Sequence, residues 1–290
     1  METRRGPMTT GNRPLAARLR IRAVLQHGAL ILASLVIGLP FLWMITTAIK
    51  SPFEVYIFPP VPWPETIRFD NFITAWRSAP FGRFYINSII TATTGVVLEV
   101  GIAALSAYAF ARIRFKYRDV LFMVLLAAMM IPGQVALIPN YVVLKHLGWI
   151  NKYSGIVIPH VSSVFGAFLL RQYFLTIPDS LYDAAEMDGL GHVRTMLYIA
   201  LPLARPVVGT LTLYLFISKW NSYLWPLIIT NTQNMRTLPV GLAMLRQAEY
   251  AIGPEHLMAA SIFVLVPVLV VFFIAQKQLI EGIAAGAVKG

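Results

Sequence analysis

Six long apolar segments dominate this sequence of 290 residues and limit the folds that it can adopt. Each is about as long as the stretch of about 20 mostly apolar residues that an α-helix needs to cross a bilayer. Only helices and closed barrels satisfy their backbone hydrogen bonds in lipid, and barrel strands need only about 9–11 residues. We therefore expect an all-α membrane protein with a bundle of six transmembrane helices, near residues 23–49, 85–111, 119–139, 154–174, 204–229 and 257–280.

The first apolar segment follows several arginines, as the apolar part of a secretory signal peptide would. Its apolar run is longer than the roughly 7–15 residues of a signal peptide, and no small-residue cleavage site closes it. We therefore expect a retained first span. The predicted division is a basic N-terminal segment at 1–22, one transmembrane domain at 23–280 and a tail at 281–290.

Composition agrees with a membrane protein and argues against other classes. The chain is 57% hydrophobic and 13% charged, against about 45–50% apolar and about 25% charged residues in soluble domains. It has no cysteine and five scattered histidines, so we expect no metal site. The formal net charge of +11 could suggest a nucleic acid partner. In so apolar a chain it indicates instead basic loops that face anionic lipid.

Lysine and arginine in the loops predict the orientation of the spans. With the N-terminus inside, the inner segments hold 15 of these residues and the outer segments hold 8. The clearest indication is the loop at 112–118, which is short and carries four basic residues, because charge bias acts mainly through short loops. We expect a multi-pass protein of the cell membrane with both termini in the cytoplasm, and with residues 175–203 on that same side.

The expected cytoplasmic loop before the fifth span has more ordered features than a simple connection requires. Residues 183–189 read Asp-Ala-Ala-Glu-Met-Asp-Gly, and residues 199–202 read Ile-Ala-Leu-Pro. Ser180 and Asp183 form a capping-box pattern that would begin a helix. Gly189 can take the left-handed conformation that ends one. Small alanines would let another protein approach closely, although an ordinary helix at the membrane interface remains an alternative.

The spacing of this loop resembles the EAA loop of permease subunits in binding-protein-dependent ABC importers. An acidic residue, two alanines, a glycine and an Ile-x-Leu-Pro tail stand at the distances of that family, with Asp183 in place of the usual glutamate. In the family this loop forms the coupling helix that contacts the ATPase. The resemblance therefore assigns ATPase coupling to Asp183, Ala184, Ala185, Glu186, Gly189, Ile199, Leu201 and Pro202.

Other motifs resemble carbohydrate importers, in particular the second, smaller permease of the maltose and sn-glycerol-3-phosphate type. The resemblance implies the fold of a type I ABC importer permease with a cytoplasmic coupling helix. It also implies a second permease subunit, two ATP-binding subunits and an extracytoplasmic solute-binding protein as partners. Its substrates would be sugars or oligosaccharides, with glycerol-3-phosphate or a polyol as the alternative. The resemblance covers about residues 35–290 and rests on residues 87–88, 107–112, 138–141, 147–149, 220–227, 236–241 and 286–290.

The chain has no motif for ATP binding or catalysis. A Gly-x-x-x-x-Gly-Lys-Ser/Thr loop is missing, and the glycines at 286–290 have the wrong spacing for one. No Ser/His/Asp arrangement is recognisable. We therefore expect a transport subunit that is not an enzyme and binds no cofactor itself, with ATP and Mg²⁺ on the partner ATPase subunits.

Two charged residues fall inside expected spans, where an ionisable side chain costs about 2.5–3.5 kcal/mol on insertion scales and indicates function. Glu99 is predicted near the centre of the second span and Lys219 in the outer half of the fifth, so we do not expect them to touch. Glu99 could form a structural hydrogen bond or buried pair, line the path of the solute or carry a proton. Lys219 could line a cavity or extend towards the interface. The candidates for the translocation path are Glu99, Lys219, Asn221 and Trp225.

Two other functional classes compete with an ATP-driven importer. A proton-coupled secondary carrier could use Glu99, but such carriers usually contain internal repeats, and none is recognisable here. A membrane enzyme would need a catalytic cluster. The importer is therefore the leading hypothesis.

Prolines predict irregular backbone in two places. The outer segment at 50–84 is rich in proline and aromatic residues, which favours extended and turn structure with a short helix near 71–78. Its aromatic side chains could form an interfacial belt or a docking surface. Prolines inside the spans are expected to kink their helices, namely Pro40, Pro132, Pro226 and Pro267.

Overall fold

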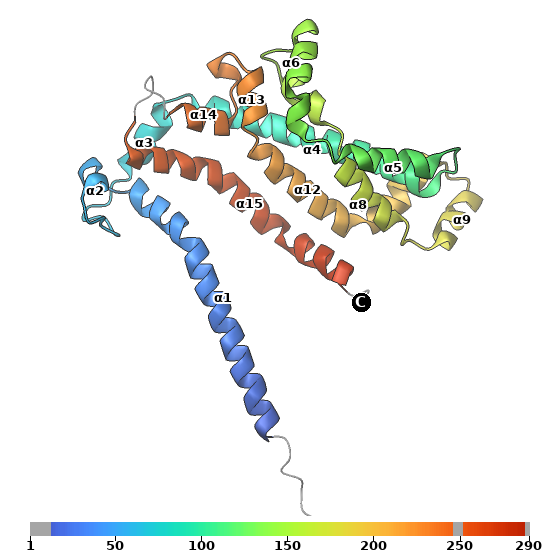
Figure 1. Cartoon of the computed structure of the whole chain (residues 1–290), viewed down its shortest axis with the longest axis horizontal. Helices are drawn as coiled ribbons and strands as arrows, with labels where there is room; N and C mark the ends of the chain where they lie inside the picture. The colour runs from blue at the N-terminus through green and yellow to red at the C-terminus, as the bar shows by residue number, and fades with distance from the viewer. Residues whose placement is uncertain (1–12, 246–251, 288–290) are drawn as a thin grey trace, which may run out of the picture.

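The computed structural model describes residues 13–245 and 252–287, and within these ranges all regular structure is helical (Figure 1). Three short 3₁₀ segments (η1, η2 and η4) and one π-helical segment (η3) interrupt the α-helices. The elements are α1 (Arg13–Ala48), α2 (Pro52–Tyr56), α3 (Asp70–Arg77), α4 (Phe81–Arg112), α5 (Arg118–Ala128), η1 (Gly133–Ala136), α6 (Leu137–His146), α7 (Tyr153–Val157), η2 (Ile158–His160), α8 (Val164–Phe174), α9 (Asp179–Met187), α10 (His192–Thr195), η3 (Met196–Ala200), α11 (Leu201–Leu203), α12 (Arg205–Trp220), α13 (Leu224–Ile229), η4 (Gln233–Met235), α14 (Leu238–Met244) and α15 (Pro254–Ala287).

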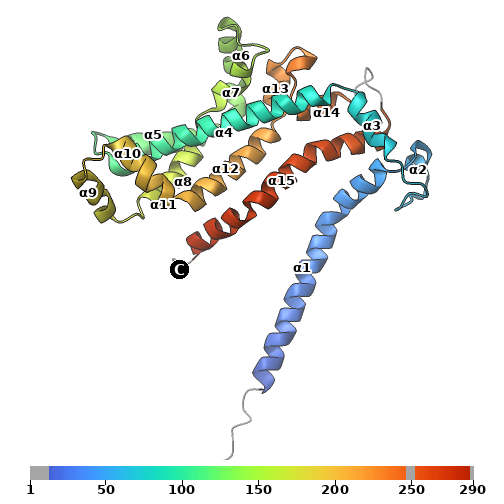
Figure 2. The same ribbon diagram turned by 180° about the vertical axis from the view of Figure 1, so that it is seen from behind.

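The body of the bundle consists of α4, α8, α12 and α15. Helix α4 packs on both α8 and α12, and α12 packs on α15. Figures 1 and 2 show α3 and α14 at one end of α4 and α9 at the other end. The two ends of the bundle are therefore built from different helices.

The predicted all-helical fold class is confirmed, but the six expected spans are not six continuous helices. Three helical stretches are long and apolar enough to cross a membrane unbroken, namely Arg22–Ala48, Phe81–Arg112 and Pro254–Gln276. Three further spans would each consist of two helical pieces, bent by 86° after α5, by 46° before α8 and by 85° before α12. Counting each bent pair as one span gives six, the predicted number. The pair bent by 85° covers residues 192–220, however, and not the expected 204–229.

The break after α5 has a local cause that hydropathy does not register. Pro132 lies between α5 and η1, where its ring and missing N–H prevent a continuous helix. The prediction of one helix over 204–229 with a kink at Pro226 is wrong. Helix α12 ends at Trp220, and Pro226 lies inside the separate helix α13. Pro40 and Pro267, by contrast, lie inside the unbroken helices α1 and α15.

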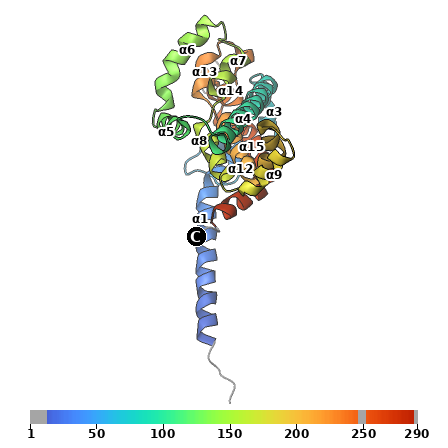
Figure 3. The same ribbon diagram turned by 90° about the vertical axis from the view of Figure 1, so that its right-hand side faces the viewer.

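Helix α1 extends away from the bundle, as Figures 1 and 3 show. It packs on α15, yet no residue in the most apolar window of its span is buried. It begins at Arg13, inside the segment 1–22 that we expected to precede the first span. At the other terminus α15 continues to Ala287, into the expected tail. The remaining parts of these two segments, 1–12 and 288–290, lie outside the described residues.

The segment at 50–84 contains two short helices, of which α2 was not predicted. The short helix predicted near 71–78 is confirmed as α3. Asn71 at its beginning donates hydrogen bonds to the carbonyls of Ala48 and Lys50, over 3.0 and 2.8 Å. These two bonds attach the segment to the end of α1.

Two apolar clusters hold the bundle together. At the end near α9, Leu170, Phe174 and Leu211 are completely buried among α4, α8 and α12. At the end near α3, Phe81 and Trp220 are buried together with residues of α14 and α15. Between these clusters the second and fifth spans carry polar side chains.

Candidate functional site

Helix α9 contains the acidic half of the 175–203 loop and ends as the sequence predicts. The N–H of Leu190 donates to the carbonyl of Ala185 over 2.9 Å, and the N–H of Gly189 donates to the carbonyl of Glu186 over 3.0 Å. This pair of bonds is a Schellman motif. It requires the left-handed conformation of Gly189, whose φ is +75°. The predicted helix terminus at this glycine is confirmed.

The beginning of α9 differs from the prediction. The capping box of Ser180 and Asp183 is wrong, because the helix begins at Asp179, follows Pro178 and has no side-chain cap. The carboxylate of Asp179 forms an ion pair with Arg112 instead. Asp183 consequently lies one turn inside the helix, where its side chain is exposed.

The two alanines of the motif occupy different environments. Ala185 is 2% exposed, whereas Ala184, Asp183, Glu186 and Met187 are exposed. Ala185 therefore packs the inner side of α9 against the rest of the chain. The outward face carries the carboxylates of Asp183 and Glu186 and the small side chain of Ala184. A basic surface of another protein can therefore pair with the carboxylates and approach the helix closely.

The second half of the loop returns to the bundle as an irregular helix. Helix α10 continues through the π-helical segment η3 into α11. Single-turn π-helical segments are rare and occur frequently at functional sites. Ile199 and Leu201 are half-buried there. The helix continues past Pro202 to Leu203 before the 85° bend.

Arg112, the last residue of α4, connects the bundle to the loop. Its guanidinium donates to the carbonyls of Phe174 and Ile177 over 2.7 and 2.6 Å, and it pairs with Asp179 at the start of α9. It also lies 3.7 Å from the ring centroid of Tyr182. The planar, five-donor guanidinium suits such a set of contacts. Arg112 thus holds the C-terminal end of α8 and the first turn of α9 against the end of α4.

Tyr108, one turn earlier on α4, contacts both halves of the loop. Its ring centroid lies 6.4 Å from that of Tyr182 and 6.2 Å from that of His192. Burial raises the pKa of Tyr182, and the charge of Arg112 acts in the opposite direction. Helix α4 therefore contacts both α9 and α10.

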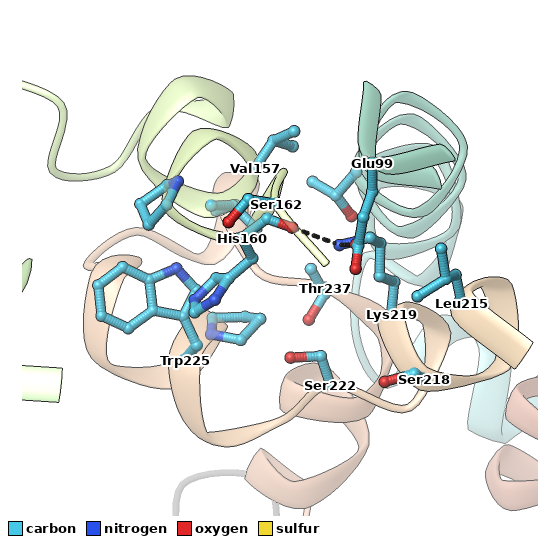
Figure 4. A pocket seen from close by; sticks show the side chains of 15 residues that line it. Glu99, Val157, His160, Ser162, Leu215, Ser218, Lys219, Ser222, Trp225 and Thr237 are labelled. Atoms are coloured by element: carbon cyan, nitrogen blue, oxygen red, sulfur yellow. Dashed lines mark hydrogen bonds and ion pairs between the residues drawn. The ribbon is translucent and has the colours of Figure 1, made fainter. Parts of the chain in front are cut away.

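A cavity of about 330 Å³ lies between α4, α12, α13 and the bend before α8 (Figure 4). Three of the four candidates for the translocation path line it: Glu99, Lys219 and Trp225. The fourth, Asn221, is not among its lining residues and is exposed beyond the end of α12. The part of the wall that the sequence did not predict includes His160, Ser162 and Thr237.

Glu99 and Lys219 form an ion pair in the wall of this cavity, with Nζ 2.5 Å from Oε2. The prediction that they do not touch is wrong for a geometric reason. Lys219 lies 14 residues after the start of α12 and Glu99 lies 13 residues before the end of α4. At about 1.5 Å per residue, both lie roughly 20 Å from the same end of the bundle. Lys219 also donates to the carbonyl of His160 over 2.9 Å.

Three important residues were not recognised from the sequence alone. Arg112 closes the motif at 107–112, which carries the family resemblance but does not indicate its partners. Gly95 and Thr237 line the cavity, and only the folded chain places them there. Among the described residues no group of three or more His, Asp or Glu side chains could hold a metal ion.

Comparison with known proteins places this geometry in a family. Residues 99–284 match the family described as the binding-protein-dependent transport system inner membrane component. The diacetylchitobiose uptake system permease protein NgcG of Streptomyces coelicolor is 30% identical over 94% of this chain and 91% of its own length. The sn-glycerol-3-phosphate transport system permease protein UgpE of Salmonella typhi is 32% identical over 90% and 95% of the two chains.

The fold comparison agrees. A chain of a bacterial ABC transporter that imports the acidic polysaccharide alginate matches 94% of this chain and 99% of its own, with a TM-score of 0.78 and 24% identity. None of these comparisons supports the alternative of a proton-coupled secondary carrier. The chain is a multi-pass membrane protein and belongs to the family of binding-protein-dependent transport system inner membrane components.

Proposed function

We propose that this chain is a permease subunit of an ATP-driven importer for sugars or oligosaccharides. It forms half of the translocation path and couples that path to a separate ATPase through residues 175–203. The observation that carries the proposal is the arrangement of α9, whose acidic face is exposed at one end of the bundle while Ala185 and Arg112 attach it to the spans. Because these contacts attach the loop to the spans, a movement of the ATPase against the loop can move the spans, and a movement of the spans can move the loop.

The proposed complex contains a second permease subunit, two ATP-binding subunits that carry ATP and Mg²⁺, and an extracytoplasmic solute-binding protein. The family description and the names of the relatives support a transport component rather than an enzyme. The same relatives support a carbohydrate as the solute, with glycerol-3-phosphate or a polyol as the alternative. Asp183, Ala184, Glu186 and Gly189 would contact the ATPase directly. Ala185, Ile199, Leu201 and Pro202 would hold the loop in shape.

Purification of the tagged chain from its own membranes tests the proposal. An ATP-binding chain and a second permease should come with it, and the loaded binding protein should stimulate ATP hydrolysis by the purified complex. Transport by this chain alone, without any ATP-binding chain, would contradict the proposal and return the secondary carrier to consideration.

Cysteine labelling should place the 175–203 loop in the cytoplasm together with both termini. The chain has no cysteine of its own, so single cysteines at Ser180 and Thr232 report without background, and both positions are exposed. In intact cells an impermeant maleimide should label position 232 and leave position 180 unlabelled until the membrane is opened. Labelling of position 180 from outside would reverse the topology and remove the argument for coupling.

A further inference from the structure

The cavity between α4 and α12 has the chemistry of a site for an uncharged solute. Its volume of about 330 Å³ lies at the lower end of the roughly 300–1,000 Å³ of small-molecule sites. Its wall combines the apolar ring of Trp225 with several hydroxyl groups. Figure 4 shows Lys219 and Glu99 on one side of it and His160 with Trp225 on the other.

The two charges of the cavity neutralise each other. Among its described lining residues only Glu99 and Lys219 carry a full charge, and they pair at 2.5 Å with side chains 9% and 17% exposed. The carbonyl of His160 accepts a further hydrogen bond from the ammonium group. An anionic solute would have to compete with Glu99 for Lys219, and a cationic one would have to compete with Lys219 for Glu99. Like charges brought together out of water repel strongly.

Gly95 on α4 leaves space for the lysine of this pair. A Cβ atom at position 95 would lie 2.7 Å from Cδ and 3.0 Å from Cε of Lys219, closer than packed atoms allow. Because Gly95 has no side chain, there is space one turn before Glu99 on α4. The aliphatic part of the Lys219 side chain occupies this space. The side chain of Lys219 therefore reaches Glu99 through space that a larger residue at position 95 would partly occupy.

Hydroxyl groups supply the recognition that charge does not. The Oγ1 atom of Thr237 is buried in the cavity wall, in a residue 4% exposed, and has no hydrogen-bond partner among the described residues. Buried polar groups in proteins are nearly always satisfied, so an orphaned one requires an explanation. Ser162, Ser218 and Ser222 place further hydroxyl groups on the same wall. A solute with many hydroxyl groups can satisfy such donors and acceptors.

We propose that this cavity is a solute-binding site within this subunit, and that the Glu99–Lys219 pair makes it selective for uncharged polyhydroxyl solutes over anionic ones. The inference rests on the proposed import function and narrows its substrate class. It is not implied by the relatives, because their names include a neutral disaccharide and sn-glycerol-3-phosphate. In this site Trp225 offers an apolar surface to the face of a sugar ring, and the serines present hydroxyl groups to it. The hydroxyl of Thr237 is buried and unpartnered among the described residues, and it turns into the cavity to reach the solute.

Calorimetric binding to the purified complex, without binding protein or ATP, tests the inference. The probes are maltose and diacetylchitobiose as neutral solutes, and glycerol-3-phosphate and an alginate disaccharide as anions. The better neutral probe should bind the wild-type complex at least about tenfold more tightly than either anion, since an unpaired or like charge is disfavoured there. Equal or tighter binding of an anion, or no binding of either neutral probe, would overturn the inference.

One charge variant and a matched control test the role of the ion pair. Glu99→Gln keeps the shape of the side chain and frees the charge of Lys219, so the preference for the neutral probe should fall by about tenfold. Glu54→Gln makes the same chemical change at a buried carboxylate of α2 outside the cavity, and should keep the wild-type preference. An unchanged preference in a folded Glu99→Gln complex would reject the role of the pair.

Thr237→Val provides a test that does not depend on the stability of the charge variant. It removes only a hydroxyl that has no hydrogen-bond partner among the described residues, so folding should be preserved. Neutral binding should weaken by about two- to tenfold, the value of one neutral hydrogen bond. Unaltered neutral binding would contradict the site. Since none of these measurements involves ATP hydrolysis, failure of the proposed coupling would leave their outcome unaffected.

Discussion

A complex carrying Gly189→Val should assemble normally and lose most of the stimulation of ATP hydrolysis by loaded binding protein. The φ of +75° at this position is a genuine outlier for a β-branched residue. A Cβ there would have nothing within 4 Å, so the change acts through backbone strain and not through a clash. Strain of about 1–3 kcal/mol is small for a whole bundle. It is enough to shift a local equilibrium about 5–150-fold.

The matched control is Gly189→Asn, because asparagine tolerates the left-handed conformation far better than valine does. It should retain most of the stimulation, although it adds a larger side chain at the same exposed position. Basal ATP hydrolysis and co-purification of the subunits should be similar in both variants. Equal stimulation in the valine variant and the wild type would mean that the shape of the end of α9 is irrelevant to coupling.

The end of α9 could be predicted from the sequence because its cause is local. A glycine after a short helical pattern terminates the helix through its own backbone freedom, whatever packs around it. The beginning of the same helix could not be predicted. Ser180 and Asp183 satisfy the capping pattern, but Asp179 obtains a partner in Arg112, 67 residues away in the chain. A tertiary contact decided between two possible starts.

The spans show the same division between local and distant causes. Apolar length correctly predicted an all-helical membrane fold, because lipid imposes that solution on the backbone. The bend after α5 follows Pro132 and so has a local cause, whereas hydropathy does not register the bends before α8 and α12. The levels of Glu99 and Lys219 follow from counting residues along α4 and α12. That these two helices pack side by side, which brings the pair together, could not be predicted from the sequence.

Replacing Arg112 by methionine should uncouple the complex in a different way. The side chain keeps an apolar stem but loses its hydrogen bonds to the carbonyls of Phe174 and Ile177 and its pairing with Asp179. Hydrogen bonds of a charged group contribute about 1.5–3 kcal/mol each. Glu99 lies on the same helix as Arg112, so a rigid α4 joins the cavity to the loop. We therefore expect ATP hydrolysis to continue at its basal rate while stimulation by loaded binding protein falls by at least about tenfold.

Two further variants distinguish this positioning role from a general loss of stability. Arg112→Lys retains the charge but cannot reproduce the planar fork, so stimulation should recover only in part. Arg68→Met removes an arginine whose ion pair with Asp70 is exposed at the other end of the bundle, and such pairs contribute only about 0–1 kcal/mol. That control should behave as wild type. If Arg112→Met lowered basal and stimulated hydrolysis in equal proportion, Arg112 would be a stabilising residue only. A lower ratio of stimulated to basal hydrolysis, partly restored by lysine, would place the connection between cavity and ATPase at the end of α4.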